Sequence, residues 1–325
     1  MAMVSTLMKC LRMIPTDSRW YWLISGPLSR MTRTETQRAA NHTICITAIL
    51  KGEDPFVEEW IAYHRLLGVD HFYLYDNDPR QPLRDILAGQ RDRVTVLEWL
   101  VEHNDSRFKG RNTQLKAYTH FLDHFAANYE WVAFIDCDEF IALEEHPDIK
   151  PFLHEFEAFD SIALNWHVFG HNGYYEDPTG LIIESLTRRM KEPRAMVKSI
   201  SRTSSIASID SAHLCKLKRG GRRVDANKRP YRQELYPGKT RIAHINHYQC
   251  RSFTNWMKKP ERGEAGTVVE DKVNAWRFSK EGCLRQFVCQ IARDKNEYVD
   301  TSMLRYGDRV KTYLEKSKDE GKDIQ

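Results

Sequence analysis

Apolar runs that alternate with amphipathic segments dominate the chain from residue 41 onward. Continuous apolar runs rich in β-branched residues are typical of strands buried on both faces, and apolar residues that recur every three or four positions indicate helices. The pattern predicts strands at 43–50, 70–75, 94–99 and 131–135, and helices at 55–68, 83–87 and 111–128. Strands that alternate with helices at this spacing favour a mostly parallel, Rossmann-like α/β sheet flanked by helices.

The alternation weakens after residue 160. Further strands are predicted at 161–166 and 241–245, and Ser252 can cap a helix that follows it. Segments rich in Gly, Pro, Lys and Arg fill much of 167–240 and are predicted to be loops. The tail from about residue 281 is predicted to be helical and increasingly charged.

Composition adds few constraints to this picture. The 325 residues are 41% hydrophobic and 29% charged, which is typical of a globular protein. Lys and Arg (49) exceed Asp and Glu (45) by only 49 − 45 = 4, so we expect no nucleic-acid partner. Seven scattered cysteines without a C-x-x-C pair argue against a zinc cluster or a disulfide framework. Reduced thiols in a cytoplasmic protein are therefore expected.

The first 40 residues form a basic and aromatic leader. Charged residues interrupt its apolar patches, so no run reaches the roughly 18 apolar residues that a membrane span needs. The leader does not fit a signal peptide well either. Basic residues beside Trp20 and Tyr21 would suit peripheral contact with the inner face of the membrane. A loosely ordered leader is the simpler interpretation, and we prefer it.

The strand predicted at 131–135 ends directly in two acidic residues, Asp136 and Asp138. In open α/β sheets, ligands bind at the carboxyl ends of the strands. Two carboxylates there repel each other unless a cation lies between them, and oxygen ligands suit Mn²⁺ or Mg²⁺. Such a metal can neutralise a diphosphate leaving group. Acidic residues also end strands as caps and turns, but the position after the fourth strand favours a metal site.

Six sequence blocks resemble glycosyltransferase family 92 and related family-2-like enzymes. In chain order they are Glu59-Trp60-x-x-Tyr63-His64, Gly68-Val69-x-His71-Phe72-Tyr73-x-Tyr75-Asp76-Asn77, Trp131-x-x-Phe134-Ile135-Asp136-x-Asp138-Glu139-Phe140, Trp166-x-x-Phe169-Gly170, Lys198-Ser199-Ile200 and His247-Tyr248-x-x-Arg251-Ser252. The resemblance implies a GT-A fold, a divalent metal, a UDP-sugar donor and inversion at the sugar carbon.

The expected function is thus a metal-dependent, inverting transfer of a hexose from a UDP-sugar to a glycan, a polysaccharide or another hydroxyl acceptor. Residues 41–265 would form the GT-A domain, with a nucleotide-sugar half at 41–140 and an acceptor half at 141–265. Residues 266–325 would form a helical C-terminal extension.

Residues at strand ends are candidates for binding the donor and its metal. Glu53 and Asp76 follow the first two strands, where a carboxylate can accept from the base or the ribose, although turn chemistry explains both positions too. The resemblance favours His247 as a further ligand of the metal or the diphosphate. His244, three residues earlier on the same strand, should point to the opposite face.

Cations on later segments could clamp the donor phosphates by charge-assisted hydrogen bonds. The candidates are Lys198, Arg251, Lys258 and Arg262. A solvated basic surface is the alternative for each of them. Asp136 is expected to contact the donor as well as the metal.

An aromatic and glycine-rich segment is the predicted acceptor site. Around Gly170 and Gly173 lie five aromatic residues, Trp166, Phe169, His171, Tyr174 and Tyr175, and aromatic faces can pack against the C–H surfaces of sugars. A small satellite core is an equal alternative. Inversion needs a general base on the acceptor side. Glu184 is the candidate, with Asp177 and Asp210 as the other carboxylates considered.

Two other functions fit parts of the pattern. A haloacid-dehalogenase-like phosphatase would use Asp136 as its nucleophile, but that class places its acidic pair after the first core strand. A non-catalytic module that binds a nucleotide sugar would keep the site without the chemistry, and the two intact aspartates speak against it.

Overall fold

The computed structural model describes residues 42–78, 83–100, 113–231, 242–262, 276, 279–291 and 296–322. All of them belong to one compact unit, residues 42–325. The predictions for the leader lie outside the described residues and stay predictions. No described helix is both long and apolar enough to cross a membrane.

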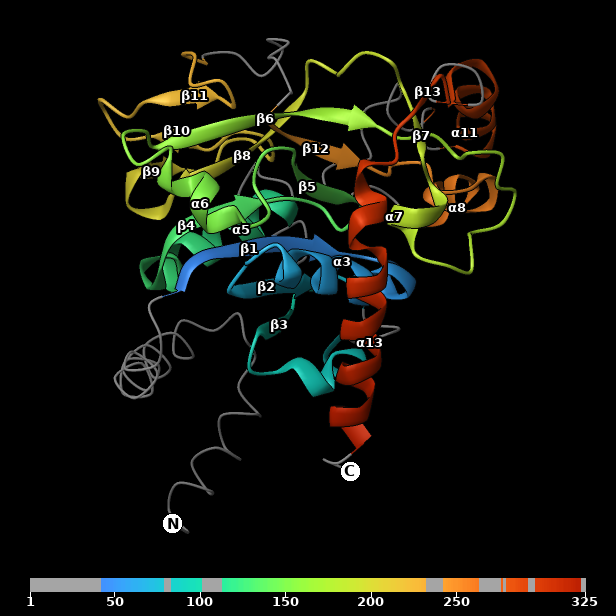
Figure 1. The fold of residues 1–325 in the computed structure, drawn as a ribbon, viewed down its shortest axis with the longest axis horizontal. Helices are drawn as coiled ribbons and strands as arrows, with labels where there is room; N and C mark the ends of the chain where they lie inside the picture. The colour runs from blue at the N-terminus through green and yellow to red at the C-terminus, as the bar shows by residue number, and fades with distance from the viewer. Residues whose placement is uncertain are drawn as a thin grey trace. The chain divides into compact units, whose positions relative to one another are not determined.

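A mixed sheet of nine described strands forms the centre of this unit (Figure 1). From one edge to the other its order is β3 (Val94–Glu98), β2 (His71–Asp76), β1 (His42–Leu50), β4 (Tyr129–Phe134), β8 (Val197–Arg202), β6 (Ser161–Val168), β12 (Ala243–His247) and β5 (Glu139–Leu143), and β11 (Arg223–Asp225) also pairs with β6. The first four strands are parallel, and β8 is antiparallel to both of its neighbours. The predicted mostly parallel α/β sheet is confirmed.

Helices cover both faces of the sheet. The main core joins the sheet to α3 (Asp54–Leu66), α6 (Ile149–His154), α7 (Ile182–Ser185) and α13 (Gly307–Lys322). A second core packs α5 (Thr113–His124) against the other face. The shorter described elements are α4 (Leu83–Ile86), β7 (Arg188–Arg189), β9 (Ile206–Ser208), β10 (Lys216–Leu217), α8 (Phe253–Met257), α9 (Lys259–Arg262), α11 (Lys280–Gln286) and β13 (Tyr298–Val299).

The C-terminal tail is helical as predicted, and it is also part of the main core. Met303, Tyr306 and Val310 are buried there. Figure 1 shows α13 running alongside α3, and the two helices are in contact. The C-terminal tail therefore packs, together with α3, in the hydrophobic core on one face of the sheet.

The predicted loops at 167–240 were wrong in one important place, because β8 runs through the middle of the sheet. Its sequence is Val197-Lys198-Ser199-Ile200-Ser201-Arg202, and several of its polar residues are buried. The segment therefore lacks the apolar pattern from which a strand is predicted. Strand β5 was also not predicted, since it begins directly at the acidic segment. The other predicted strands are present, with ends shifted by one or two residues.

Side chains of α3 hold the outer edge of β5. The Trp60 indole donates to Glu139 O at 2.7 Å, and the Tyr63 hydroxyl donates to Ile141 O at 2.7 Å. His64 Nδ1 donates to Trp60 O at 2.8 Å, while its Nε2 accepts from Ile141 N at 3.2 Å. These bonds satisfy the backbone of an edge strand. They also fix the strand that follows the two aspartates.

Candidate active site

Asp136 lies in the turn between β4 and β5 and is held by two side chains. One carboxylate oxygen accepts from Gln114 Nε2 of α5 at 2.8 Å, and the other accepts from Lys198 Nζ of β8 at 2.9 Å. About a third of the side chain (37%) is exposed. Gln114 and Lys198 therefore fix the orientation of the Asp136 carboxylate, and its exposed part remains accessible to a ligand.

Lys198 is fully buried between two acids. Its ammonium group lies 2.9 Å from Asp136 Oδ2 and 3.3 Å from Glu139 Oε2, and Glu139 Oε2 also accepts from Asp136 N at 2.8 Å. Burial alone would lower the pKa of Lys198, but the charges of Asp136 and Glu139 outweigh it and hold this pKa above its ordinary value. The structure thus pairs this cation with two protein acids, and the expected contact between Lys198 and the donor stays a prediction.

Asp138 points toward β12 instead of β8. Its Oδ2 lies 3.4 Å from His247 Nε2, and 22% of its side chain is exposed. Its backbone carbonyl accepts from Tyr248 N at 2.8 Å. Burial raises the pKa of Asp138, but His247, Arg251 and Lys259 outweigh this effect, and the pKa lies well below its usual range. Asp138 is therefore a carboxylate at neutral pH.

His247 ends β12 directly opposite Glu139 of β5. Its Nδ1 has no hydrogen-bond partner among the described residues, and its ring centroid lies 4.3 Å from that of Trp166. His244 contacts a different residue, His167, with ring centroids 3.9 Å apart and planes inclined by 30°. Of the two histidines, His247 is thus the one beside Asp138.

Asp138 and His247 carry ligand atoms that suit a divalent cation, and the expected contact of Asp136 with the metal stays a prediction. A carboxylate and an imidazole on one side leave the other coordination positions to water and phosphate oxygens, as Mg²⁺ and Mn²⁺ sites commonly do. The side chains of the two aspartates have different partners. Asp136 bonds to α5 and β8, whereas Asp138 contacts β12. Within the described ranges, no group of three or more His, Cys, Asp or Glu side chains could hold a metal.

Arg251 connects the end of β12 to the end of β1. Its guanidinium pairs with Glu53 Oε2 at 2.6 Å and lies 3.8 Å above the ring of Phe56. The residue is almost fully buried and has a φ of 51°, a left-handed conformation that is costly for a residue other than glycine. Glu53 and Arg251 therefore bind each other, and their expected contacts with the donor stay predictions.

Asp76 builds a turn at the end of β2. Its two carboxylate oxygens accept from Asp78 N at 3.0 Å and from Leu83 N at 2.6 Å. This is the turn chemistry that the sequence offered as the alternative, and contact with the donor stays a prediction.

Lys258 and Lys259 differ in their surroundings at the end of α8. Lys258 is exposed at the end of α8, whereas Lys259 lies 4.1 Å above the ring of Trp256 and contributes to the low pKa of Asp138. The side chain of Arg262 lies outside the described residues. Contacts of Lys258 and Arg262 with the donor remain predictions.

The predicted acceptor residues are dispersed. Trp166 is half-buried beside His247, and His171 lies in a satellite cluster, with its ring centroid 4.8 Å from that of Phe287. Phe169 is only 1% exposed and packs on Tyr248, and the expected contact between its ring and an acceptor stays a prediction.

Glu184 is tied to the last helix. Its carboxylate lies on α7 and pairs with Lys311 Nζ of α13 at 2.7 Å. None of its hydrogen bonds or ion pairs described here joins it to Asp136 or Asp138. The role of Glu184 as the general base stays a prediction.

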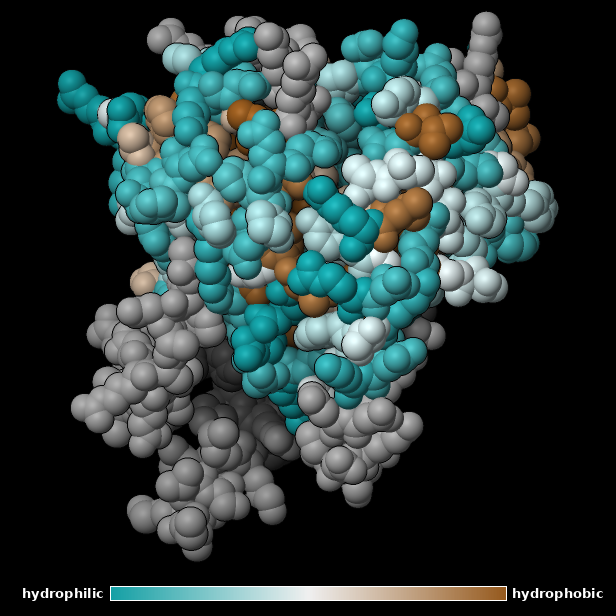
Figure 2. Space-filling view, in the orientation of Figure 1, coloured by the Kyte–Doolittle hydropathy of each residue, from teal (hydrophilic) through white to brown (hydrophobic). Residues whose placement is uncertain are grey.

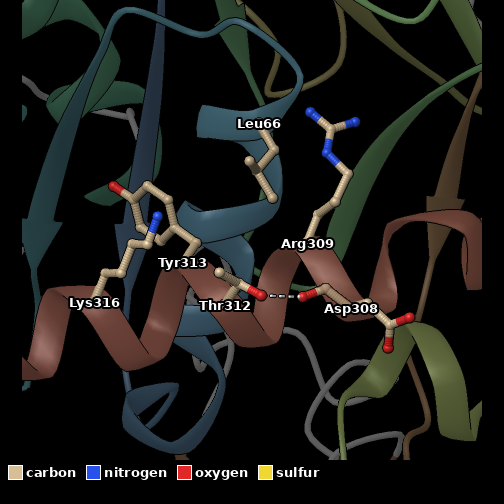
Figure 3. A pocket seen from close by; sticks show the side chains of 6 residues that line it. All are labelled: Leu66, Asp308, Arg309, Thr312, Tyr313 and Lys316. Atoms are coloured by element: carbon tan, nitrogen blue, oxygen red, sulfur yellow. Dashed lines mark hydrogen bonds between the residues drawn. The ribbon is translucent and has the colours of Figure 1, made fainter.

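A pocket of about 340 Å³ opens elsewhere, between α13 and the end of α3. Figure 3 shows its lining residues Leu66, Asp308, Arg309, Thr312, Tyr313 and Lys316, with Thr312 Oγ1 donating to Asp308 O at 2.9 Å. The pocket contains none of the predicted site residues, so it does not compete with the acidic turn as the candidate site.

Comparisons with known proteins agree on the family. The sequence model of glycosyltransferase family 92 matches residues 40–277. A family 92 protein of Arabidopsis thaliana is 24% identical over 267 residues, which cover 77% of this chain and 42% of that protein. One from Ricinus communis is 27% identical over 239 residues, covering 70% and 39%. The chain thus spans about two fifths of the length of the curated relatives it matches.

Solved structures show a weaker likeness. Glucosyl-3-phosphoglycerate synthase from Mycobacterium tuberculosis, in complex with phosphoglyceric acid, is 16% identical with a TM-score of 0.31, covering 54% of this chain and 62% of that one. The same enzyme in complex with Mn²⁺, UDP-glucose and phosphoglyceric acid gives a TM-score of 0.30. A likeness of this size supports no conclusion about the site. The family match covers most of the chain and includes the acidic turn, and the chain belongs to glycosyltransferase family 92.

Proposed function

We propose that this protein transfers a hexose from a nucleoside diphosphate sugar, with UDP as the nucleotide, to a hydroxyl group of a glycan or polysaccharide. The observation that carries this proposal is the pairing of Asp138 with His247 where β12 ends beside the β4–β5 turn. An ionised carboxylate and an imidazole at the carboxyl ends of strands suit a metal-bound diphosphate.

Asp138 and His247 would hold Mn²⁺ or Mg²⁺ through Oδ2 and Nε2. Bound there, the metal would neutralise the negative charge that develops on the diphosphate as its bond to the sugar breaks. Asp136, oriented by Gln114 and Lys198, would accept hydrogen bonds from hydroxyl groups of the donor. Lys198 would position Asp136.

The acceptor must lose a proton in the transfer, whichever hydroxyl group it presents. An inverting reaction assigns this to a protein carboxylate on the acceptor side. Glu184 is our candidate, on the condition that Lys311 releases it when the acceptor binds. Asp177 is a weaker candidate, because it already accepts from Ser252 Oγ at 2.6 Å and Asn255 Nδ2 at 3.1 Å.

Release of UDP from a panel of UDP-sugars tests the proposal, with Mn²⁺ and with excess chelator. GDP-sugars in parallel test the choice of nucleotide. We expect UDP release that depends on metal and is lost in Asp138→Asn, with Asp92→Asn as a control for an exposed acid elsewhere. Metal-dependent phosphate release from p-nitrophenyl phosphate, without nucleotide release, would favour the phosphatase instead.

A further inference from the structure

Tyr175 presents a flat aromatic face to solvent. The residue is 65% exposed, although its ring stacks on Phe253 of α8 with centroids 5.2 Å apart and planes inclined by 22°. Because Phe253 covers one face of the Tyr175 ring, the exposed surface includes the other face. On the largely hydrophilic surface of Figure 2, apolar patches are small and separated.

The loop that carries Tyr175 is fastened to the start of α8. Phe253 N donates to Tyr174 O at 3.1 Å, and Thr254 N donates to Tyr175 O at 2.9 Å. Asp177 accepts from Ser252 Oγ and Asn255 Nδ2, which binds the far end of the loop to the same helix. The ring is thus held in place before any ligand arrives, which reduces the entropy lost on binding.

The residue after Tyr175, Glu176, is acidic and is bonded to the same helix. Glu176 is exposed, and its Oε2 accepts from Thr254 Oγ1 at 3.0 Å, so its carboxylate is held by the residue next to Phe253. An aromatic face packs against the C–H side of a pyranose ring, and a neighbouring carboxylate can accept from the sugar hydroxyl groups. The two side chains together have the chemistry of a saccharide subsite.

The chain connects this surface to the candidate active site over a few residues. Strand β12 ends at His247, Arg251 pairs with Glu53, and Ser252 caps α8, where Phe253 supports the ring. Figure 1 shows α8 at the end of the sheet toward which β6 and β12 point. A sugar on Tyr175 would therefore lie at the end of the sheet where the transfer is proposed to occur.

We propose that Tyr175 and Glu176, backed by Phe253, form a subsite that binds a pyranose unit of the acceptor glycan. This inference rests on the proposed function for its role in transfer, but the binding of a saccharide can be measured without any donor. The segment from Tyr174 to Asp177, rather than Phe169, would then provide the aromatic contact with the acceptor.

Saturation-transfer NMR on the full chain tests the subsite with methyl β-glycosides of galactose, glucose, mannose and N-acetylglucosamine. We expect wild-type protein to saturate the ring protons of at least one glycoside. Tyr175→Ala should weaken that binding about tenfold, in line with the loss of one stacking contact, and Tyr175→Phe should retain it. Tyr298→Ala removes another exposed tyrosine and should bind as wild type does.

The results separate this proposal from the one on which it rests. No saturation of any glycoside by wild-type protein, or equal binding by Tyr175→Ala, would overturn the subsite. A protein that shows no thermal shift with nucleotide sugars, yet binds a glycoside through Tyr175, would leave the subsite standing and refute the donor site. Circular dichroism of each variant checks that it is folded.

Discussion

His247 Nε2 lies 3.4 Å from Asp138 Oδ2 because β5 and β12 are paired in one register. That register places Glu139 opposite His247, so the residue just before Glu139 meets the imidazole. Trp60 and Tyr63 of α3 hold β5 from its other side. The proposed metal site therefore depends on strand pairing as much as on the acidic motif.

His247→Ala should weaken the binding of Mn²⁺ in the presence of UDP by at least about tenfold, because the site loses one of its two protein ligands. Titration of Mn²⁺ followed by electron paramagnetic resonance measures this affinity. His244→Ala is the matched control, since its ring contacts that of His167. An equal loss in both variants would remove His247 from the metal site.

Lys198→Met should destabilise the fold by about 3–5 kcal/mol, because it leaves acids facing a buried position without their cation. Urea unfolding measures this change. The double variant Lys198→Met with Glu139→Gln should recover part of the loss, since one buried acid is then neutral. A single variant as stable as wild type would contradict the ion pairs described here.

Gly68→Ala should cost more stability than Gly220→Ala. Both glycines have a positive φ, 98° and 86°, so each substitution carries backbone strain of about 1 kcal/mol. A Cβ at Gly68 would also lie 2.7 Å from the carboxylate of Asp148, which caps α6, whereas a Cβ at Gly220 would meet nothing within 4 Å. Equal melting temperatures for the two variants would refute the steric part of this difference.

Stability should fall in acid partly because of His64. Burial lowers the pKa of His64 from 6.5 to about 3, although its bond to Trp60 O opposes the shift. The neutral ring is therefore favoured in the folded state. Its contribution to the free energy of unfolding is complete above the pKa of the unfolded state and is lost as the pH falls from about 6.5 toward 3. Within that window, each pH unit lowers the free energy of unfolding by about 1.4 kcal/mol, because the unfolded state binds one more proton.

Urea unfolding at several pH values between 6.5 and 4 measures this slope. The slope should be smaller by about one proton in His64→Gln than in wild type. His154→Gln provides the control, because His154 is exposed and pairs with Glu157. Identical slopes for wild type and His64→Gln would show that His64 is not held neutral in the fold.

The first half of the fold could be predicted from periodicity because its strands are apolar on both faces. Ile44, Cys45 and Ile46 are all fully buried, and such runs identify a strand directly. Strand β8 gave no such signal, since Lys198 is stabilised by acids that are distant in sequence. Nothing in a single sequence shows that a lysine has two buried partners.

The candidate site could be predicted in its location but not in its geometry. The sequence shows that Asp136 and Asp138 follow directly after a strand. It also shows that His247 lies within two residues of the end of the strand predicted at 241–245. The sequence treats the two aspartates alike, whereas Gln114 and Lys198 hold only the first of them. No periodicity or charge pattern in the sequence identifies Gln114 as a partner of Asp136. The sequence does not indicate the left-handed conformation of Arg251 either.

The most direct test of the account is a thermal-shift measurement with UDP-sugars, with and without Mn²⁺, on wild type and on Asp138→Ala. A ligand that binds only the folded state raises the melting temperature in proportion to its binding free energy. We predict a rise for wild type that requires both the donor and Mn²⁺, and no rise for a folded Asp138→Ala. A rise of the same size in Asp138→Ala, or one that does not need Mn²⁺, would contradict the claim that Asp138 holds a metal against the donor diphosphate.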